Sequence, residues 1–318
     1  TVKISINRFY MGVRLRLYHF TATSLAASIL SDAIRLGHLV THTDEIAHGV
    51  VWLTSYPYPD KTGVPMKETR LSSKQLAHAS RVENRSLGNN LSHDKSRIRL
   101  GLDSNSLKSF EIVDNKPTGL ISFEKWCKLV GAPKNWAKYI GMSACFDLEN
   151  MTDEEKVRQM KKKGNTQEST WYLHFGPIAA KLLDAVDCKV GKDYVPFDFE
   201  KHGRNDLSYV GIECVSPTSL AELRKIVEPW SSLEMVYAAV FCEGPSARPE
   251  VTVRGGGVTC HIDIETGEVR QYINSRDDYP LSEVRGWIER HKAELSQCWD
   301  SALTAYYRYY PEEAPQDA

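Results

Sequence analysis

The segment from Leu281 to Ala302 constrains the fold of this chain more than any other part of its sequence. Its apolar and aromatic residues recur at steps of three or four, which is the period of one helix face. The residues of this face are Val284, Trp287, Ile288, His291, Leu295, Trp299 and Ala302. Such a face is stable only when it packs on another apolar surface. The sequence therefore predicts one closing helix that packs on a sheet.

Three short runs before this helix have the composition of strands. They cover residues 234–242, 249–254 and 258–264. Residues 265–268 predict a hairpin turn in which Gly267 adopts a positive φ. The glycine run 255–257 is also expected to bend the chain in a hairpin. Together these features predict a small α+β accessory domain at residues 234–310, joined by a linker at residues 228–232.

Composition narrows the classes of protein to which this chain can belong. A length of 318 residues favours about two domains. The net charge of −1 gives no overall field that requires nucleic acid or an anionic membrane. The apolar stretches, such as residues 236–242, are too short to cross a bilayer, so no membrane partner is expected. Met11 precedes a strand-like run and is a candidate start of the natural chain.

Seven cysteines are scattered along the chain without a C-x-x-C pair. This pattern predicts reduced, buried thiols in the cytoplasm and argues against a disulfide framework and a zinc site. The histidines His42 and His48 lie close to Asp44, but no third ligand follows at metal spacing. No metal ligands are therefore expected.

The first two thirds of the chain alternate between strand and helix patterns. Strands are expected at residues 13–21, 48–54, 96–102, 169–175 and 209–215. Helices are expected at residues 25–34, 123–130, 135–140, after the capping box 152–155, and from Ser216-Pro217 to Val227. Between residues 60 and 100, nine Lys/Arg face four acids. This segment is either a solvated basic loop or a positive flap over a phosphate-bearing ligand.

The closing helix carries Trp287-x-Glu289-x-His291-x-x-Glu294-Leu295-x-x-x-Trp299, and residues 262–269 precede it at the spacing of strand, turn and helix. Over about 70 residues this pattern resembles a small bacterial domain family of unknown function. That family is usually encoded beside a toxin–antitoxin-like partner. Its members typically carry P-H-x-H-V on a strand, where this chain has Pro249-Glu250-Val251-Thr252-Val253. The resemblance therefore implies a regulatory or partner-binding module. Both histidines are replaced in this chain, so a ligand or metal role carried by that pair is expected to be absent.

Residues 11–228 resemble ADP-ribosyltransferase-fold proteins. The resemblance rests on Leu17-Tyr18-His19-Phe20-Thr21 before a helix, on Val51-Trp52-Leu53-Thr54, and on Arg97-Ile-Arg99 and Trp171-Tyr172-Leu173. It implies an α+β fold with an ADP-ribosyltransferase-like split β core and helices. The small C-terminal antiparallel sheet packed on a helix completes the expected fold class.

This second resemblance also implies a site that uses NAD as a substrate. His19 would orient NAD, Glu168 would stabilise the positive charge that develops at the ribose, and Arg97 would hold phosphate. The other expected NAD-binding residues are Tyr18, Thr21, Trp52, Thr54 and Trp171. Relatives often place an acid directly before the Trp, where this chain has Thr170. Glu168 lies two residues earlier and shares a face with that position only if the strand reaches it.

The residue types suit the expected chemistry. Loss of nicotinamide passes through an oxocarbenium-like state, as glycoside hydrolysis does, and a fixed carboxylate stabilises that charge as it develops. Aromatic rings hold the flat nicotinamide, and basic groups meet the diphosphate.

Two functions remain open from the sequence. The first is an NAD-dependent ADP-ribosyltransferase-like protein of a bacterial or phage conflict system, a toxin or antiphage effector. Its acceptor would be an anionic nucleic acid or nucleotide, or a protein partner. The alternative is a catalytically inactive recognition protein, a sensor or inhibitor with the same fold. The sequence does not determine the oligomeric state.

Overall fold

The structure is a computed structural model, and it describes residues 15–35, 37–43, 45–60, 62, 64, 66, 93–134, 136, 152, 154–155, 157–158, 168–202, 210–212, 215–228, 236–242, 244–273 and 275–315. The chain forms two compact units. The first comprises Thr1–Thr23 and Ile34–Phe197, and the second comprises Ser24–Ala33 and Asp198–Ala318. The second unit thus includes residues 24–33 and 198–228, which the sequence-based boundaries assigned to the first domain.

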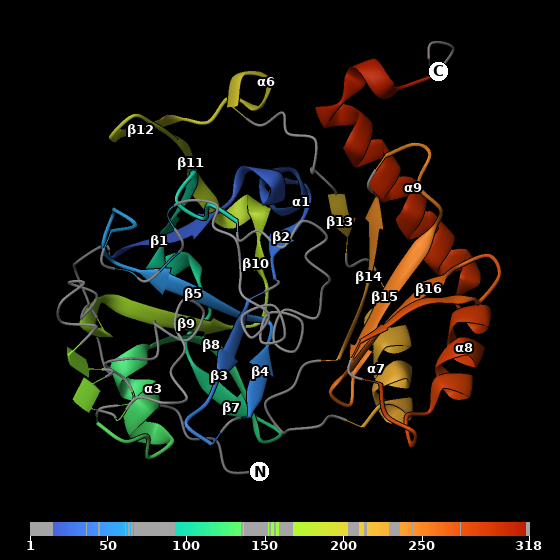
Figure 1. The fold of residues 1–318 in the computed structure, drawn as a ribbon, viewed down its shortest axis with the longest axis horizontal. Coiled ribbons are helices and arrows are strands. Elements are labelled where there is room, and N and C mark those ends of the chain that lie inside the picture. The colour runs from blue at the N-terminus through green and yellow to red at the C-terminus, as the bar shows by residue number, and fades with distance from the viewer. Residues whose placement is uncertain are drawn as a thin grey trace. The chain divides into compact units, whose positions relative to one another are not determined.

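The first unit is built on an eight-stranded antiparallel sheet with the order β12-β11-β6-β1-β5-β9-β8-β7. Its strands are β1 (Arg16–Thr21), β5 (Val50–Thr54), β6 (Ile98–Asp103), β7 (Glu111–Val113), β8 (Lys116–Ser122), β9 (Trp171–Phe175), β11 (Leu183–Val190) and β12 (Asp193–Pro196). Shorter strands of the chain are β2 (Ala33–Ile34), β3 (His38–Val40), β4 (Ile46–His48) and β10 (Ile178–Ala179). Figure 1 shows β1, β5, β9 and β8 as neighbouring arrows.

Backbone turns account for two departures from the predicted elements of the first unit. The expected strand at 48–54 is divided into β4 and β5 because Gly49 has a φ of 74°. The expected helix at 25–34 ends early, as α1 (Ala26–Ser31). Its C-cap residue Asp32 has a φ of −148°, outside the helical range, and its N–H donates to the carbonyl of Ile29. Ala33 and Ile34 then form β2, because a buried strand satisfies their apolar side chains as well as a helix face would.

The helix α3 (Phe123–Leu129) forms where the sequence predicts it. Ser122 caps it by accepting a hydrogen bond from the Lys125 N–H at 3.4 Å. The predicted capping box is also confirmed, because the Thr152 N–H donates to Glu155 at 2.8 Å and the Glu155 N–H donates to Thr152 at 3.3 Å. The expected helix at 135–140 lies outside the described residues except for Trp136.

The second unit is a five-stranded antiparallel sheet with the order β13-β14-β15-β16-β17. Its strands are β13 (Val210–Ile212), β14 (Tyr237–Cys242), β15 (Glu250–Gly255), β16 (Val258–Asp263) and β17 (Val269–Ile273). Its helices, in addition to α1, are α6 (Phe199–His202), α7 (Pro217–Ile226), α8 (Leu281–Arg290) and α9 (Lys292–Tyr309). The expected α+β class, with a large antiparallel sheet and a separate smaller one packed on helices, is therefore confirmed.

Both predicted hairpins of this sheet are present. Gly256 and Gly257 have φ values of 61° and 74° between β15 and β16, as a two-residue turn requires. In the next turn Gly267 has a φ of 67° and its N–H donates to the carbonyl of Asp263 at 2.9 Å. The turns fix the register that pairs Val251 with Ile262 and Val253 with Cys260, so these apolar side chains share one face of the sheet.

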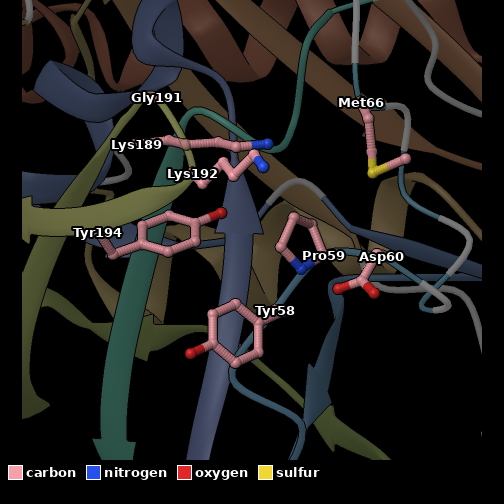
Figure 2. Close-up of a pocket in the computed structure, with 8 residues that line it drawn as sticks. All are labelled: Tyr58, Pro59, Asp60, Met66, Lys189, Gly191, Lys192 and Tyr194. Carbon is pink, nitrogen blue, oxygen red and sulfur yellow. The ribbon is translucent and has the colours of Figure 1, made fainter.

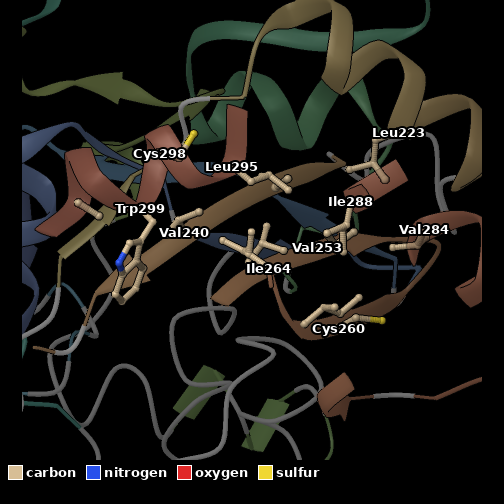
Figure 3. Close-up of a cluster of buried hydrophobic side chains, with 14 of the residues drawn as sticks. Leu223, Val240, Val253, Cys260, Ile264, Val284, Ile288, Leu295, Cys298 and Trp299 are labelled. Carbon is tan, nitrogen blue, oxygen red and sulfur yellow. The ribbon is translucent and has the colours of Figure 1, made fainter. Parts of the chain in front are cut away.

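The core of the second unit lies between this sheet and its helices (Figure 3). Trp287 is its largest fully buried side chain. The indole N–H of Trp287 donates to the carbonyl of Ser219 at 2.9 Å, which ties α8 to α7. The members of the predicted helix face are all buried except His291, which is half-buried.

The predicted single closing helix is in fact two helices that meet at His291. This residue has φ −107° and ψ 15°, and its N–H is shared between the carbonyls of Trp287 and Ile288 at 3.0 and 3.1 Å. The sequence offers no Gly or Pro as a signal for the break. The His291 ring instead bonds to Ser219 and Glu222 of α7, so a tertiary contact holds the residue at the junction.

The cysteines correct one sequence-based expectation. Cys127, Cys188, Cys242 and Cys260 are buried thiols, as expected. Cys298 differs, because it is disulfide-bonded. The redox argument for a cytoplasmic protein therefore rests on four of the cysteines, and the location stays a prediction. No helix in the described part of the chain is long and apolar enough to cross a membrane.

Candidate functional site

Three neighbouring strands carry most of the residues singled out from the sequence. His19 lies on β1, Thr54 on β5 and Trp171 at the start of β9, and these strands are adjacent in the order β1-β5-β9. Tyr18 is in register with Thr54, and Thr54 is in register with Trp171. Residues in register on antiparallel strands point to the same side, so Tyr18, Thr54 and Trp171 share one face of the sheet.

His19 lies where β1 and β5 separate, since Tyr18 and Thr54 are the one described pair in register between these strands. Its Nδ1 is 2.9 Å from the carbonyl oxygen of Trp52. A carbonyl oxygen only accepts, so Nδ1 carries a proton and donates. Burial lowers the pKa of His19 to about 4, against the opposing effect of this hydrogen bond. At neutral pH the ring is therefore uncharged, and its Nε2 is an acceptor.

Thr54 connects β5 to the residue that precedes Trp171. Its hydroxyl donates to the hydroxyl of Thr170 at 3.2 Å and accepts a hydrogen bond from the Tyr56 N–H at 3.0 Å. Thr54 is buried, and so is Thr21 on β1. The position directly before the Trp therefore lies beside Thr54, whose side chain is on the face of the sheet opposite to that of His19, and it carries a hydroxyl rather than a carboxylate.

Glu168 lies in a 3-10 turn (Glu168–Thr170), and β9 begins only at Trp171. The strand does not reach Glu168, so strand alternation does not aim its side chain at the face of Thr170. The side chain of Glu168 is outside the described part of the structure.

The two predicted pocket tryptophans belong to an aromatic cluster. The ring of Trp52 lies 5.9 Å from that of Trp171 and 5.1 Å from that of Phe123, which is itself 5.7 Å from Trp171. Trp171 is 4% exposed and Phe123 is 0% exposed. The indole N–H of Trp52 donates to the carbonyl of His38 at 2.8 Å. These contacts fix both indoles in place. The two rings therefore pack between the strands and position them.

Arg97 is exposed, whereas Arg99 is the arginine that organises this face. Two nitrogens of Arg99 donate to one oxygen of Asp187 at 2.8 and 3.1 Å, and a third donates to the carbonyl of Pro57 at 2.9 Å. Its guanidinium carbon lies 4.3 Å from the ring centre of Tyr194 and 5.3 Å from that of Tyr18. No local pattern distinguishes the two arginines, because only the pairing of β6 with β1 reveals their positions.

A cavity of about 210 Å³ lies next to this stack. Figure 2 shows the side chains that line it, with the ammonium groups of Lys189 and Lys192 pointing to the same side. The lining residues are Tyr58, Pro59, Asp60, Met66, Lys189, Gly191, Lys192 and Tyr194. Sequence reasoning missed both lysines. The available signal was Gly191-Lys192 between two strand-like runs, the composition of a two-residue hairpin.

The basic segment at 60–100 is described only in part. Of its nine basic residues, the structure describes Lys95, Arg97 and Arg99, and the other six lie outside the described residues. The choice between a solvated loop and a flap over a ligand stays open for that segment.

A second polar cluster surrounds His291 in the second unit. Its Nε2 lies 2.9 Å from Glu222 and its Nδ1 lies 3.2 Å from the hydroxyl of Ser219, which donates to Glu294 at 2.6 Å. Glu294 also accepts from the Ser216 N–H. Ser219 is 4% exposed, so a substrate has no access to its hydroxyl. This cluster joins α7 to α8 and α9 and is structural.

The strand β15, where Glu250 and Thr252 replace the family's two histidines, contacts a histidine of the next strand. Glu250 and Thr252 occupy the places of the usual pair, and both contact His261 of β16, at 3.0 and 3.2 Å from its Nδ1. An imidazole nitrogen is therefore present beside Glu250 and Thr252, but it comes from His261 of the neighbouring strand β16. No group of three or more His, Cys, Asp or Glu side chains among the described residues is arranged to hold a metal ion.

Comparisons with known proteins add no further constraint. No protein-family model, no curated protein and no solved structure matches this chain.

Proposed function

We propose that this protein is an NAD-using ADP-ribosyltransferase-like protein of a bacterial or phage conflict system, acting as a toxin or antiphage effector. The observation that carries the proposal is the adjacency of β1, β5 and β9. These strands are distant in sequence, yet they bring His19, Thr54 and Trp171, all part of the resemblance, to one region of a single sheet, with Thr170 at the place where the chain departs from it.

The state of His19 suits an orienting role. Its ring is fixed by the Trp52 carbonyl and is neutral at physiological pH, since its pKa is about 4. A neutral ring with a fixed Nδ1–H presents Nε2 as an acceptor for a ribose hydroxyl. In the proposal Tyr18 and Thr54 contribute a half-buried ring and a buried hydroxyl on the opposite face of the sheet, since side chains alternate along β1.

A specific observation favours the second candidate, a catalytically inactive recognition protein. Thr170 stands where relatives often carry an acid, and its hydroxyl accepts from Thr54. Glu168, the acid nearest in sequence, precedes the strand. A fixed carboxylate at the developing positive charge supplies much of the rate in such chemistry, so its absence from position 170 favours binding without turnover.

Nicotinamide release from NAD, measured with the full-length protein, separates the two functions. Release by the wild type that is lost in both His19→Ala and Glu168→Ala supports the transferase and excludes the inactive protein. Absence of both release and NAD binding by calorimetry refutes the transferase. Intact release by Glu168→Ala retains the enzyme class and refutes the role of Glu168.

Thr170→Glu provides a gain-of-function test of the site. It places a carboxylate next to the Thr54 hydroxyl, and we expect nicotinamide release to rise at least about tenfold because the group stabilises the developing charge. Thr170→Gln is the matched control, with the same size and no charge. An equal response of the two variants would remove position 170 from the site.

The second unit is proposed as a regulatory or partner-binding module. In support, the side chains of its His291 cluster are occupied in hydrogen bonds between helices. No exposed side chain of that cluster belongs to a nucleophile–base pair. Nicotinamide release by the full chain with and without His261→Ala tests whether the altered histidine strand affects the proposed reaction.

A further inference from the structure

The cavity next to Tyr194 is an open site between two segments of the first unit. One wall is residues 58–60 with Met66, and the other is the hairpin of β11 and β12. The hairpin is fixed in register, with Lys189 opposite Tyr194 and Val190 opposite Asp193. Gly191 makes the turn with a φ of 64°. A rigid hairpin therefore presents both lysines to the cavity (Figure 2).

The lysines differ from the other cations of this face in their partners. Arg16 is 2.8 Å from Asp184, and Arg99 is 2.8 Å from Asp187. Neither Lys189 nor Lys192 forms an ion pair with a described carboxylate, although Asp60 lines the same cavity. Two ammonium groups without a described counter-ion in one concave site attract an anionic group such as a phosphate.

The cavity also offers aromatic walls. Tyr58 is 48% exposed, and its ring makes an edge contact with Tyr56 at 5.9 Å. Tyr194 is held more firmly, because its hydroxyl donates to the carbonyl of Ser96 at 2.7 Å and Arg99 stacks on its ring. Tyr58 thus presents an exposed ring face on which a flat ligand can stack.

Size limits what this cavity can hold. Sites that bury a whole drug-sized ligand usually have volumes of about 300–1,000 Å³. A volume of about 210 Å³ accommodates a sugar phosphate, and the base of the same nucleotide can extend over the exposed ring of Tyr58 at the edge of the cavity. A complete dinucleotide such as NAD does not fit, so this cavity is distinct from the proposed NAD site.

The geometry points to this cavity as the site for one phosphate-bearing nucleotide unit of a single-stranded acceptor. Lys189 and Lys192 bind the phosphate, Tyr58 stacks on the base, and Asp60 accepts a hydrogen bond from an N–H group of the base. The acceptor role rests on the proposed function, whereas binding itself does not. The ligand chemistry is shared by a free mononucleotide and a nucleotide within a strand.

Fluorescence anisotropy with a labelled single-stranded thymidine oligonucleotide of about 12 nucleotides tests the inference on the full chain without NAD. We expect Lys189→Gln/Lys192→Gln to weaken binding at least about tenfold. The slope of log K against log salt should become shallower by about 0.7, because the two lysines together neutralise one phosphate of the single strand. Tyr58→Ala should weaken binding by about five- to 150-fold, and Tyr58→Phe should retain it.

Lys125→Gln/Lys181→Gln is the matched control, because both residues are exposed and lie in the first unit outside the cavity. Equal weakening by this pair, or no oligonucleotide or thymidine monophosphate binding by the wild type, overturns the inference. Lysine-dependent binding of thymidine monophosphate as tight as that of the oligonucleotide supports the pocket and assigns a free nucleotide. Pocket-dependent binding without nicotinamide release retains this site and refutes the transferase.

Discussion

Replacing Asp263 by Asn tests how one side chain holds the hairpin between β16 and β17. The Asp263 carboxylate is 5% exposed and accepts hydrogen bonds from the N–H groups of Glu265 and Thr266 at 3.0 and 2.8 Å. Arg270 donates to its other oxygen at 2.7 Å. Asn keeps the shape but removes the charge and turns its amide NH2 toward either the Arg270 guanidinium or the two backbone N–H donors, so Asp263→Asn should destabilise the second unit.

The magnitude follows from the pKa of Asp263. Burial raises this pKa, but the hydrogen bonds from Arg270, Thr266 and Glu265 outweigh burial and lower it from 3.8 to about 2. At about 1.4 kcal/mol per pH unit, ionised Asp263 stabilises the folded state by about 2.5 kcal/mol. Because the folded pKa is the lower one, this stability is fully present above about pH 4 and declines as the pH falls toward 2. About half should remain at pH 3.

Hydrogen exchange of peptides from residues 258–273, followed through a urea series at pH 7 and pH 3, measures this contribution in the full chain. Glu268→Gln is the matched control, because Glu268 lies 3.6 Å from the same arginine, carries the same charge and is 64% exposed. We expect it to change the unfolding free energy by less than about 0.5 kcal/mol. An equal effect of the two variants, or a destabilisation by Asp263→Asn that is the same at both pH values, would refute the reasoning.

Three further predictions concern packing and reactivity. Trp287→Phe should lower the unfolding free energy of the second unit by about 2–3 kcal/mol in urea titrations, because it removes the bond to the Ser219 carbonyl and leaves a small void; a decrease below about 1 kcal/mol would contradict this. Gly37→Ala should destabilise the first unit by at least about 2 kcal/mol, since a Cβ there collides with the Val50 carbonyl oxygen; a thermal melting temperature equal to the wild type would exclude that collision. Burial raises the pKa values of Cys127 and Cys260 to about 12, so a thiol reagent at pH 8 should label them only after unfolding; labelling of the native protein at the rate of a free thiol would contradict their burial.

Local chemistry made parts of the fold predictable. The turn at residues 265–268 forms because Gly267 adopts a φ of 67° without steric cost, and α7 begins where Ser216 caps it before Pro217. The apolar face of the closing helices is buried because its residues recur at helical spacing and form one apolar stripe, which packs on the sheet. Each of these signals lies within a few residues, so a single sequence contains it.

The candidate site depended on contacts between segments far apart in sequence. The pattern of Arg97-Ile-Arg99 does not tell which arginine faces the tyrosines of the site. Register with β1 places Arg99 between Tyr18 and Tyr194, and Arg97 remains exposed. In the same way, Lys189 and Lys192 meet Tyr58 only because a hairpin and a distant loop line one cavity.

Local patterns in the chain were sufficient to predict the α+β class, the two hairpins of the second sheet and the apolar face of its closing helices. These depend on backbone preferences and on spacing along one element. Long-range packing sets the order β1-β5-β9, the neutral state of His19 and the break between α8 and α9 at His291. Those features arise from strand pairing, desolvation and side-chain contacts between distant residues, which no local pattern encodes.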